Sequence, residues 1–267
     1  MDPWVGSLKR RGASRHPVTG CAILTLRNSV GGDNAMASIT IQASDGSGSF
    51  SAYLVEPKTR PAGVLVLIQE IFGVNQPMRD IAAWVADMRF IAVCPDLFWR
   101  IEPGIDITDK TEADWKRAFE LFNRFDQARG IDDLKATVAA ARKLPGANGR
   151  VGTMGYCLGG RLAVMMAEQS DADVNISYYG VGLDNLVGGL GSVKKPLVLH
   201  IADKDEFFPA EGRAKVVDAV NGHRQVAAYV YPDADHAFAR VGGTHWDGRS
   251  STIANGRSAE ALVTALG

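Results

Sequence analysis

Residues 152–169 read "GTMGYCLGGRLAVMMAEQ": a short apolar run, a Gly-x-Cys-x-Gly turn and an alanine-rich helical stretch. A strand that leads through a tight turn directly into a helix is half of a βαβ unit. Gly155 and Gly159 lack a Cβ, so that strand and helix can approach each other on both sides of Cys157. The stretch therefore predicts an α/β fold with a cysteine held at a strand-to-helix turn.

The remaining sequence continues this alternation. Apolar or alternating runs predict strands at 39–43, 50–55, 63–69, 91–94, 151–154, 174–179, 196–201 and 226–231, and helical periodicity predicts helices at 78–88, 112–125, 131–143, 158–168, 210–220 and 255–266. Right-handed βαβ connections place helices on both faces of a mostly parallel central sheet. Together with the cysteine turn, this pattern predicts the α/β-hydrolase fold.

The domain organisation follows from length and patterning. The chain has 267 residues, which suits one large domain, and residues 36–267 are its predicted extent. Residues 1–35 carry five basic and two acidic side chains and lack regular patterning. This N-terminal extension could be a targeting peptide, a disordered tail or translated sequence upstream of a true start at Met36. We favour the last, because regular patterning begins there.

Composition excludes several classes of protein. The formal net charge of -1 provides no basic surplus for nucleic acid, and no apolar run approaches the length of a membrane span. Three cysteines, Cys21, Cys94 and Cys157, have neither disulfide nor zinc-ligand spacing. We expect a soluble cytoplasmic monomer that uses no metal or organic cofactor and binds a small molecule.

Cys157 occupies the place of the nucleophile in the strand-turn-helix elbow of α/β-hydrolases, where serine is usual. The positive end of the following helix favours a thiolate and an oxyanion, and the Leu158 N–H is one expected oxyanion donor. The alternative is a buried structural cysteine in a glycine-rich turn. Partners in the order nucleophile, acid, histidine would favour the catalytic interpretation.

Such partners follow in that order. Asp205 comes after the strand expected at 196–201, and His236 comes after the strand at 226–231. Both lie at carboxyl ends of strands, where open α/β sheets place their sites. An aspartate fixes the tautomer of a catalytic histidine and supports its charged form. Asp203 is the alternative acid, but it lies nearer the strand, so we favour Asp205.

A further carboxylate, Glu70, lies in the loop after the strand at 63–69. In hydrolases this loop provides the second oxyanion N–H, which here would be that of Ile71. Glu70 could accept the Cys157 proton, pair with an arginine, or be an ordinary solvated side chain.

Six motifs occur in order from about residue 39 to the C-terminus, and together they resemble the dienelactone hydrolase family, also called carboxymethylenebutenolidases. They are "QEIFGVN" (69–75), "CPDLFWR" (94–100), "GYCLGGR" (155–161), "SYYGVGLD" (177–184), "DKDEFFP" (203–209) and "HAFAR" (236–240). The resemblance implies a catalytic triad of Cys157, Asp205 and His236, with Glu70 helping to activate the thiol.

The resemblance also implies a substrate. Arg100 and Arg240 match the arginines that bind the substrate carboxylate, and Tyr179, with Phe98 and Tyr178 more loosely, matches pocket residues. The implied reaction converts dienelactone (4-carboxymethylenebut-2-en-4-olide) to maleylacetate, in the breakdown of chlorinated aromatics. Two alternatives stay open: an esterase or thioesterase of the same fold with another substrate, and a non-catalytic thiol protein that senses redox state or binds a ligand.

Overall fold

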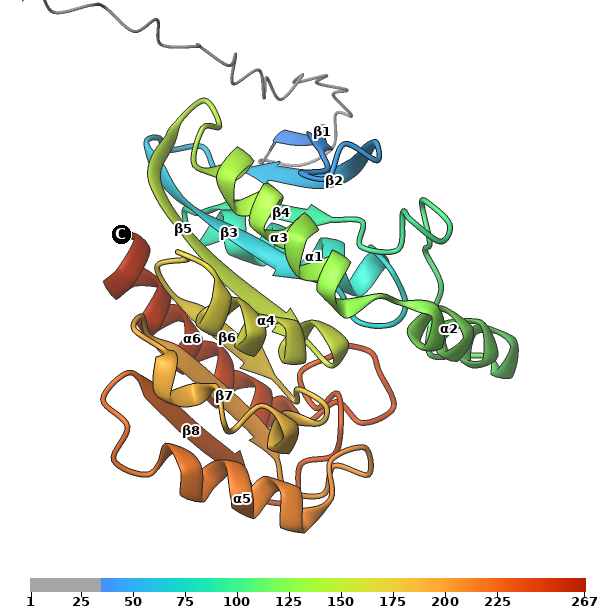
Figure 1. The fold of residues 1–267 in the computed structure, drawn as a ribbon, viewed down its shortest axis with the longest axis vertical. Coiled ribbons are helices and arrows are strands. Elements are labelled where there is room, and N and C mark those ends of the chain that lie inside the picture. The colour runs from blue at the N-terminus through green and yellow to red at the C-terminus, as the bar shows by residue number, and fades with distance from the viewer. Residues whose placement is uncertain (1–34) are drawn as a thin grey trace, which may run out of the picture.

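The structure is a computed structural model that describes residues 35–267, and the predicted N-terminal extension lies outside the described residues except for Ala35. One eight-stranded sheet runs through the molecule in the order β1-β2-β4-β3-β5-β6-β7-β8 (Figure 1). Its strands are β1 (Ala35–Gln42), β2 (Ser49–Glu56), β3 (Ala62–Ile68), β4 (Ile91–Pro95), β5 (Ala147–Tyr156), β6 (Asn175–Tyr178), β7 (Leu197–Ala202) and β8 (Val226–Tyr231). The pairs β1–β2 and β2–β4 are antiparallel, and the remaining neighbours, β4–β3, β3–β5, β5–β6, β6–β7 and β7–β8, are parallel.

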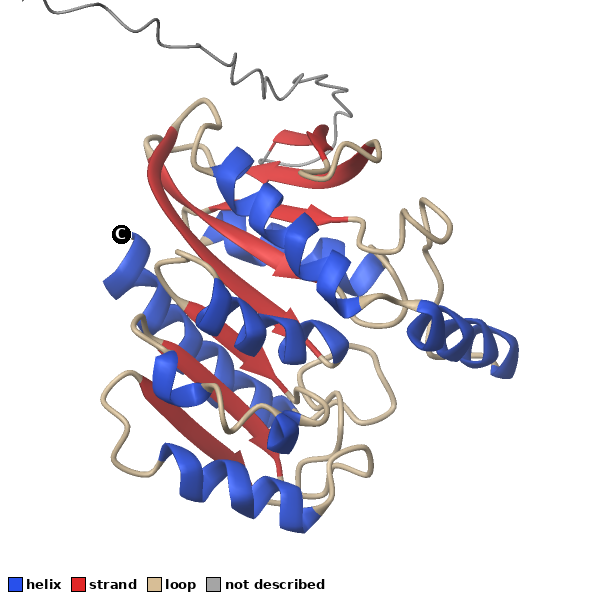
Figure 2. Ribbon diagram, viewed as in Figure 1, coloured by secondary structure: helices blue, strands red, loops and turns tan. Residues whose placement is uncertain are grey.

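Helices cover both faces of this sheet, as the sequence predicts (Figure 2). They are α1 (Gln76–Asp87), α2 (Glu112–Arg124), α3 (Gln127–Ala141), α4 (Leu158–Gln169), α5 (Ala210–Val220) and α6 (Gly248–Leu266). α3, α4 and α5 pack on one face, and α1 and α6 pack on the other. Two short 3-10 turns, η1 (Leu183–Asn185) and η2 (Leu190–Ser192), join β6 to β7.

The central strands are buried on both faces. Every residue of β3, β4, β6 and β7 is buried, and burial on both faces accounts for the nearly continuous apolar runs of β3, β4 and β7. The parallel arrangement brings the carboxyl ends of β3, β5, β7 and β8 to one edge of the sheet. The predicted site residues lie in or beside the loops that leave this edge.

Several boundaries differ from the prediction, and those of α6 and β5 show why. α6 begins at Gly248 and not near residue 255, because the Asp247 side chain caps it by accepting bonds from the N–H groups of Arg249 and Ser250. β5 spans 147–156 and not 151–154, because its N-terminal part continues beyond the buried region. The residues in these two segments are largely polar, so apolar periodicity does not indicate that they belong to the strand or the helix.

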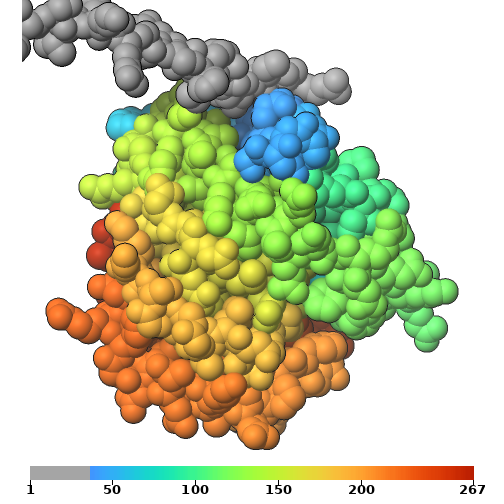
Figure 3. Space-filling model, in the orientation of Figure 1, coloured from blue at the N-terminus to red at the C-terminus, as the bar shows by residue number. Residues whose placement is uncertain are grey.

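α2 has an unusual position. It extends beyond the sheet (Figure 1) and forms a projecting lobe on the molecular surface (Figure 3). Ala118 and Leu121 are its fully buried residues, while Trp115 and Phe122 are half-buried and Phe119 is exposed. α2 therefore places an aromatic face beside the edge of the sheet where the site lies. Among residues 35–267, no helix is long and apolar enough to cross a membrane.

Candidate active site

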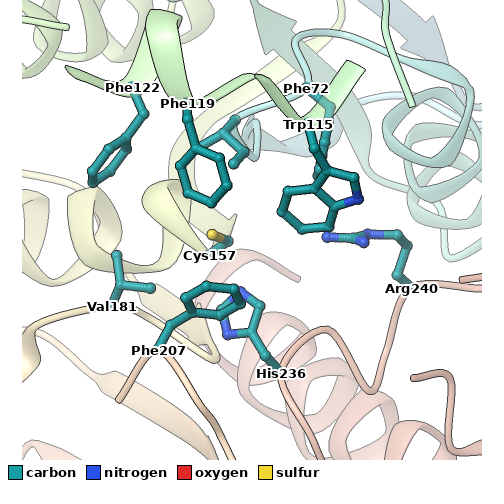
Figure 4. Close-up of a pocket in the computed structure, with 10 residues that line it drawn as sticks. Phe72, Trp115, Phe119, Phe122, Cys157, Val181, Phe207, His236 and Arg240 are labelled. Carbon is teal, nitrogen blue, oxygen red and sulfur yellow. The ribbon is translucent and has the colours of Figure 1, made fainter. Parts of the chain in front are cut away.

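Cys157 lies at the turn between β5 and α4, with φ 56° and ψ -115°. Positive φ is unfavourable for a residue with a side chain, so the surrounding structure must impose it. A Cβ on Gly155 would lie 2.0 Å from the Gly159 oxygen, and a Cβ on Gly159 would lie 2.2 Å from the Ile68 oxygen. The glycines thus permit the close packing that the sequence predicted, and the Cys157 sulfur lies in a cavity (Figure 4).

His236 and Asp205 form a buried pair. His236 Nδ1 is 2.8 Å from Asp205 Oδ2, and Asp205 Oδ1 accepts a hydrogen bond from the Phe207 N–H at 2.9 Å. Asp203, the alternative acid, is half exposed, and its carboxylate is 3.9 Å from Arg213. The structure therefore brings Asp205, and not Asp203, to the histidine.

The electrostatics of the pair extend to Cys157. Burial opposes the charged ring, but the negative charge of Cys157 and hydrogen bonds to Asp205 and Cys157 outweigh it and raise the pKa of His236 to about 10. Because Asp205 occupies Nδ1, Nε2 is the ring nitrogen left for the sulfur. This environment favours the protonated imidazolium form of His236.

Glu70 pairs with Arg240. Glu70 Oε2 and Oε1 accept bonds from Arg240 Nε at 2.8 Å and Nη2 at 2.9 Å, a bidentate contact between two buried side chains. Arg240 Nη1 also donates to Asp109 Oδ2 at 2.7 Å. Of the possibilities open for Glu70, the structure shows pairing with an arginine.

Ile71 and Leu158 lie where oxyanion donors are expected. Ile71 follows β3 in the loop and lines the cavity, and Leu158 is the first residue of α4. The first N–H groups of a helix have no partner within it. The Gly159 contact with Ile68 places the start of α4 directly against the end of β3. Both backbone segments therefore border the space beside Cys157.

The cavity has a volume of about 220 Å³ and is mainly apolar. Figure 4 shows Trp115 and Phe119 on one side of the Cys157 sulfur and Phe207 and His236 on the other. Its lining consists of Ile71, Phe72, Trp115, Phe119, Phe122, Cys157, Val181, Phe207, His236 and Arg240. The aromatic residues were missed by the sequence analysis, although the spacing of 115, 119 and 122 places them on one face of a helix.

The structure does not bring Arg100 to this cavity. Arg100 Nε and Nη2 bind the buried Asp133 carboxylate at 2.9 and 2.7 Å, and Nη1 lies 3.1 Å from Asp45. Its guanidinium also lies 4.4 Å from the centre of the Trp99 ring. A buried carboxylate needs a cationic partner, and Asp133 holds Arg100 for that reason. The expected role of Arg100 in binding a substrate carboxylate is therefore not supported by its position.

The expected pocket tyrosine and phenylalanine lie outside the lining. Tyr179 is buried, and its ring makes an edge contact with the imidazole of His236, with 5.1 Å between the ring centroids. Phe98 is fully buried against Phe125, 5.7 Å between ring centroids. Tyr178 is also buried, and its hydroxyl bonds Ser258 and Asn255. All three side chains belong to the core, and of the three Tyr179 contacts His236.

The arrangement provides the parts for acyl transfer: a thiol at a helix start, a histidine oriented by a carboxylate, and backbone N–H groups beside them. No three His, Cys, Asp or Glu side chains in the described part of the chain are grouped to hold a metal ion.

Comparison with known proteins agrees with this architecture. The chain is 52% identical over 234 residues to a protein of Azospirillum brasilense with the provisional name carboxymethylenebutenolidase, covering 87% of this chain and all of that one. It is 37% identical to the carboxymethylenebutenolidase of Pseudomonas putida, covering 84% and 95% of the two chains.

Solved structures share the fold at lower identity. A crystal structure provisionally described as a dienelactone hydrolase, from Klebsiella pneumoniae subsp. pneumoniae MGH 78578, superposes with a TM-score of 0.74 at 22% identity, covering 86% of this chain and 99% of that one. The model of the dienelactone hydrolase family matches residues 50–264, which include the elbow, the Asp205–His236 pair and the aromatic cavity. The chain therefore belongs to the dienelactone hydrolase family.

Proposed function

We propose that this enzyme opens the ring ester of dienelactone to give maleylacetate, with Cys157 as nucleophile, in the breakdown of chlorinated aromatics. The observation that carries the proposal is the placement of Cys157 at the helix start, beside the buried His236–Asp205 pair, in one cavity. The carboxymethylenebutenolidase names of relatives at 37% and 38% identity support the substrate.

In the proposed reaction the Cys157 thiolate attacks the lactone carbonyl, and its oxyanion accepts bonds from the N–H groups of Ile71 and Leu158. The C–O bond of the ring breaks, the leaving enolate oxygen takes the proton from His236, and the resulting enol tautomerises to the ketone of maleylacetate. A water molecule then loses a proton to His236 and hydrolyses the thioester. Asp205 keeps the imidazole oriented in both steps.

Glu70 and Arg240 have separate parts in the proposal. Arg240 reaches the cavity wall and is the proposed partner of the substrate carboxylate. Both carboxylate oxygens of Glu70 are engaged by Arg240, which positions the guanidinium. A direct role of Glu70 in activating the thiol stays a prediction.

The apolar lining gives a specific reason to keep a second candidate, an esterase with a neutral substrate. Aromatic side chains from α2 and the loops enclose the sulfur, and they suit uncharged ring or aryl groups as well as a lactone.

Both described cysteines, Cys94 and Cys157, are free thiols, which is consistent with the reducing cytoplasm that we propose as the compartment.

The test is an ultraviolet assay of ring opening with cis- and trans-dienelactone. We expect turnover by the wild-type enzyme and a loss of at least about a thousandfold in Cys157→Ala, because the nucleophile is removed. Cys94→Ala is the matched control, since Cys94 is a buried cysteine of β4 outside the cavity, and it should retain activity. Near-normal turnover by a folded Cys157→Ala protein would contradict the proposal.

A further inference from the structure

Asp109 gives Arg240 a second carboxylate partner. It lies in the loop before α2, and its Oδ2 is 2.7 Å from Arg240 Nη1. The two side chains are 11% and 7% exposed, so solvent screens their contact weakly. The backbone of Asp109 is also held, because its carbonyl accepts a bond from the Trp115 indole N–H at 2.9 Å. The contact is thus built into the same segment that forms the aromatic wall.

The negative charges around Arg240 outnumber its own single positive charge. Glu70 engages Nε and Nη2, and Asp109 engages Nη1, so two carboxylates surround one guanidinium. All three nitrogens already donate to an anion. A carboxylate that enters the cavity therefore meets a cluster with a net negative charge, although Arg240 itself is positive.

The cavity offers no other permanently cationic side chain among its described lining residues. Apart from Cys157, His236 and Arg240, the side chains in the wall are hydrocarbon or aromatic. His236 is already committed to Asp205 and Cys157. A substrate carboxylate must therefore compete for Arg240, whereas an uncharged ring packs against the aromatic side chains without such competition.

The space behind Arg240 allows this competition to occur. Asp109 and Arg240 also line a second cavity of about 230 Å³, which includes Lys110 and lies outside the catalytic cavity. This space gives the Asp109 carboxylate room when a substrate carboxylate takes its place on Nη1.

We propose that Asp109 is a specificity-determining residue that competes with the substrate carboxylate for Arg240 and so shifts the preference of the enzyme toward uncharged esters and lactones. The inference rests on the proposed ester hydrolysis at Cys157 and concerns which substrates that site accepts. Glu70 positions Arg240, and Asp109 determines how much of its charge is available to the substrate.

The test compares dienelactone with its methyl ester, which has the same ring but lacks the negative charge. Asp109→Asn keeps the size of the side chain and one acceptor oxygen while removing its charge. We expect kcat/KM for dienelactone to rise about tenfold, mainly through a lower KM, because one repulsive charge is lost. For the methyl ester kcat/KM should change less than about twofold, so the ratio of the two constants rises.

Two variants act as controls. Asp106→Asn removes a charge from the same loop, but Asp106 pairs with Arg79 at 2.7 Å and lies outside the catalytic cavity, so the ratio should stay at the wild-type value. Asp109→Glu restores the charge and should restore the wild-type ratio. If Asp109→Asn does not fold, judged by thermal unfolding, Asp109→Ser tests the same loss of charge.

The outcomes separate this inference from the proposed function. If wild-type enzyme opens both lactones in a Cys157-dependent manner but the Asp109→Asn ratio is unchanged, the inference is wrong and the proposed function stands. If Asp109→Asn changes kcat/KM by the same factor for dienelactone and for its methyl ester, Asp109 has only a structural role, and the inference is also wrong. If wild-type enzyme opens neither lactone, the proposed function fails, and the inference fails with it.

Discussion

At the scale of single residues, His236 is the centre of the site's electrostatics. It contacts Asp205 through Nδ1, and its charged form is favoured by the neighbouring Cys157. Burial alone would favour the neutral ring. The raised pKa of His236 therefore depends on two partners, Asp205 and Cys157, which lie 31 and 79 positions away in the sequence.

This balance predicts the alkaline limb of the pH–rate profile. His236 is protonated below its pKa of about 10 and neutral above it, so loss of the proton donor should lower kcat/KM as the pH rises through that value. Asp205→Asn removes an anion that stabilises the imidazolium. The pKa of His236 should then fall, and the alkaline limb should move to lower pH by about one unit, with a lower kcat.

The measurement is kcat/KM for a neutral ester between pH 5 and 11, a range set roughly by the ordinary and the raised histidine pKa. Asp203→Asn is the matched control, because Asp203 is half exposed and its carboxylate faces Arg213, whereas His236 Nδ1 is bonded to Asp205. An identical alkaline limb in the wild-type enzyme and Asp205→Asn would contradict the assignment.

At the scale of elements, the β5–α4 turn joins local sequence to tertiary packing. Gly159 lies in the first turn of α4 directly against the carbonyl groups of Ile68, the last residue of β3, and of Gln69, which follows it. This contact brings the helix start beside the loop that carries Glu70 and Ile71. A larger residue at position 159 would separate the two sides of the site.

Gly159→Ala should therefore be destabilising, although alanine normally favours a helix. Its Cβ would lie 2.2 Å from the Ile68 oxygen, and we expect a loss of about 1–3 kcal/mol in the free energy of unfolding together with a fall in kcat. Gly256→Ala in the exposed middle of α6 has no atom within 4 Å of the new Cβ. In that control variant the free energy of unfolding should rise by about 0.5–1 kcal/mol. Urea unfolding of both variants measures the difference, and equal effects would refute the packing argument.

At the scale of the whole molecule, α6 runs from the loop that carries site residues to the opposite ends of the central strands β3 and β5. The loop before it carries His236 and Arg240, while its C-terminal residue Leu266 is fully buried. Leu266 packs against Gly63 of β3 and Gly152 of β5. The two central strands that lead to the site are thus covered by the same helix.

Leu266→Ala should lower the free energy of unfolding by about 2–5 kcal/mol, because it leaves a cavity against two glycines that have no side chain to fill it. Val263→Ala, on the exposed side of α6, should change it by less than about 0.5 kcal/mol. Denaturant unfolding distinguishes them. Similar values for the two variants would show that α6 does not anchor these strands.

Much of the fold was predictable because the relevant patterns are local. Apolar runs identified the eight strands, and the glycines around Cys157 indicated the elbow. The start of α6 was missed because its first turns are polar and its cap, Asp247, resembles many loop aspartates. The aromatic face of α2 was predicted as part of a helix, but no local pattern says which cavity such a face lines.

The sequence by itself determined the α/β alternation, the strand-to-helix cysteine turn and the order of Cys157, Asp205 and His236, since each depends on neighbouring residues or on chain order. Only the tertiary structure decided the partners of the two arginines. Arg100 and Arg240 have the same chemistry, yet Asp133 holds one away from the cavity, while Glu70, 170 positions distant, and Asp109 hold the other at its wall. Buried charges bind whichever counter-charges folding brings within reach, and that distance is set by packing and not by position along the chain.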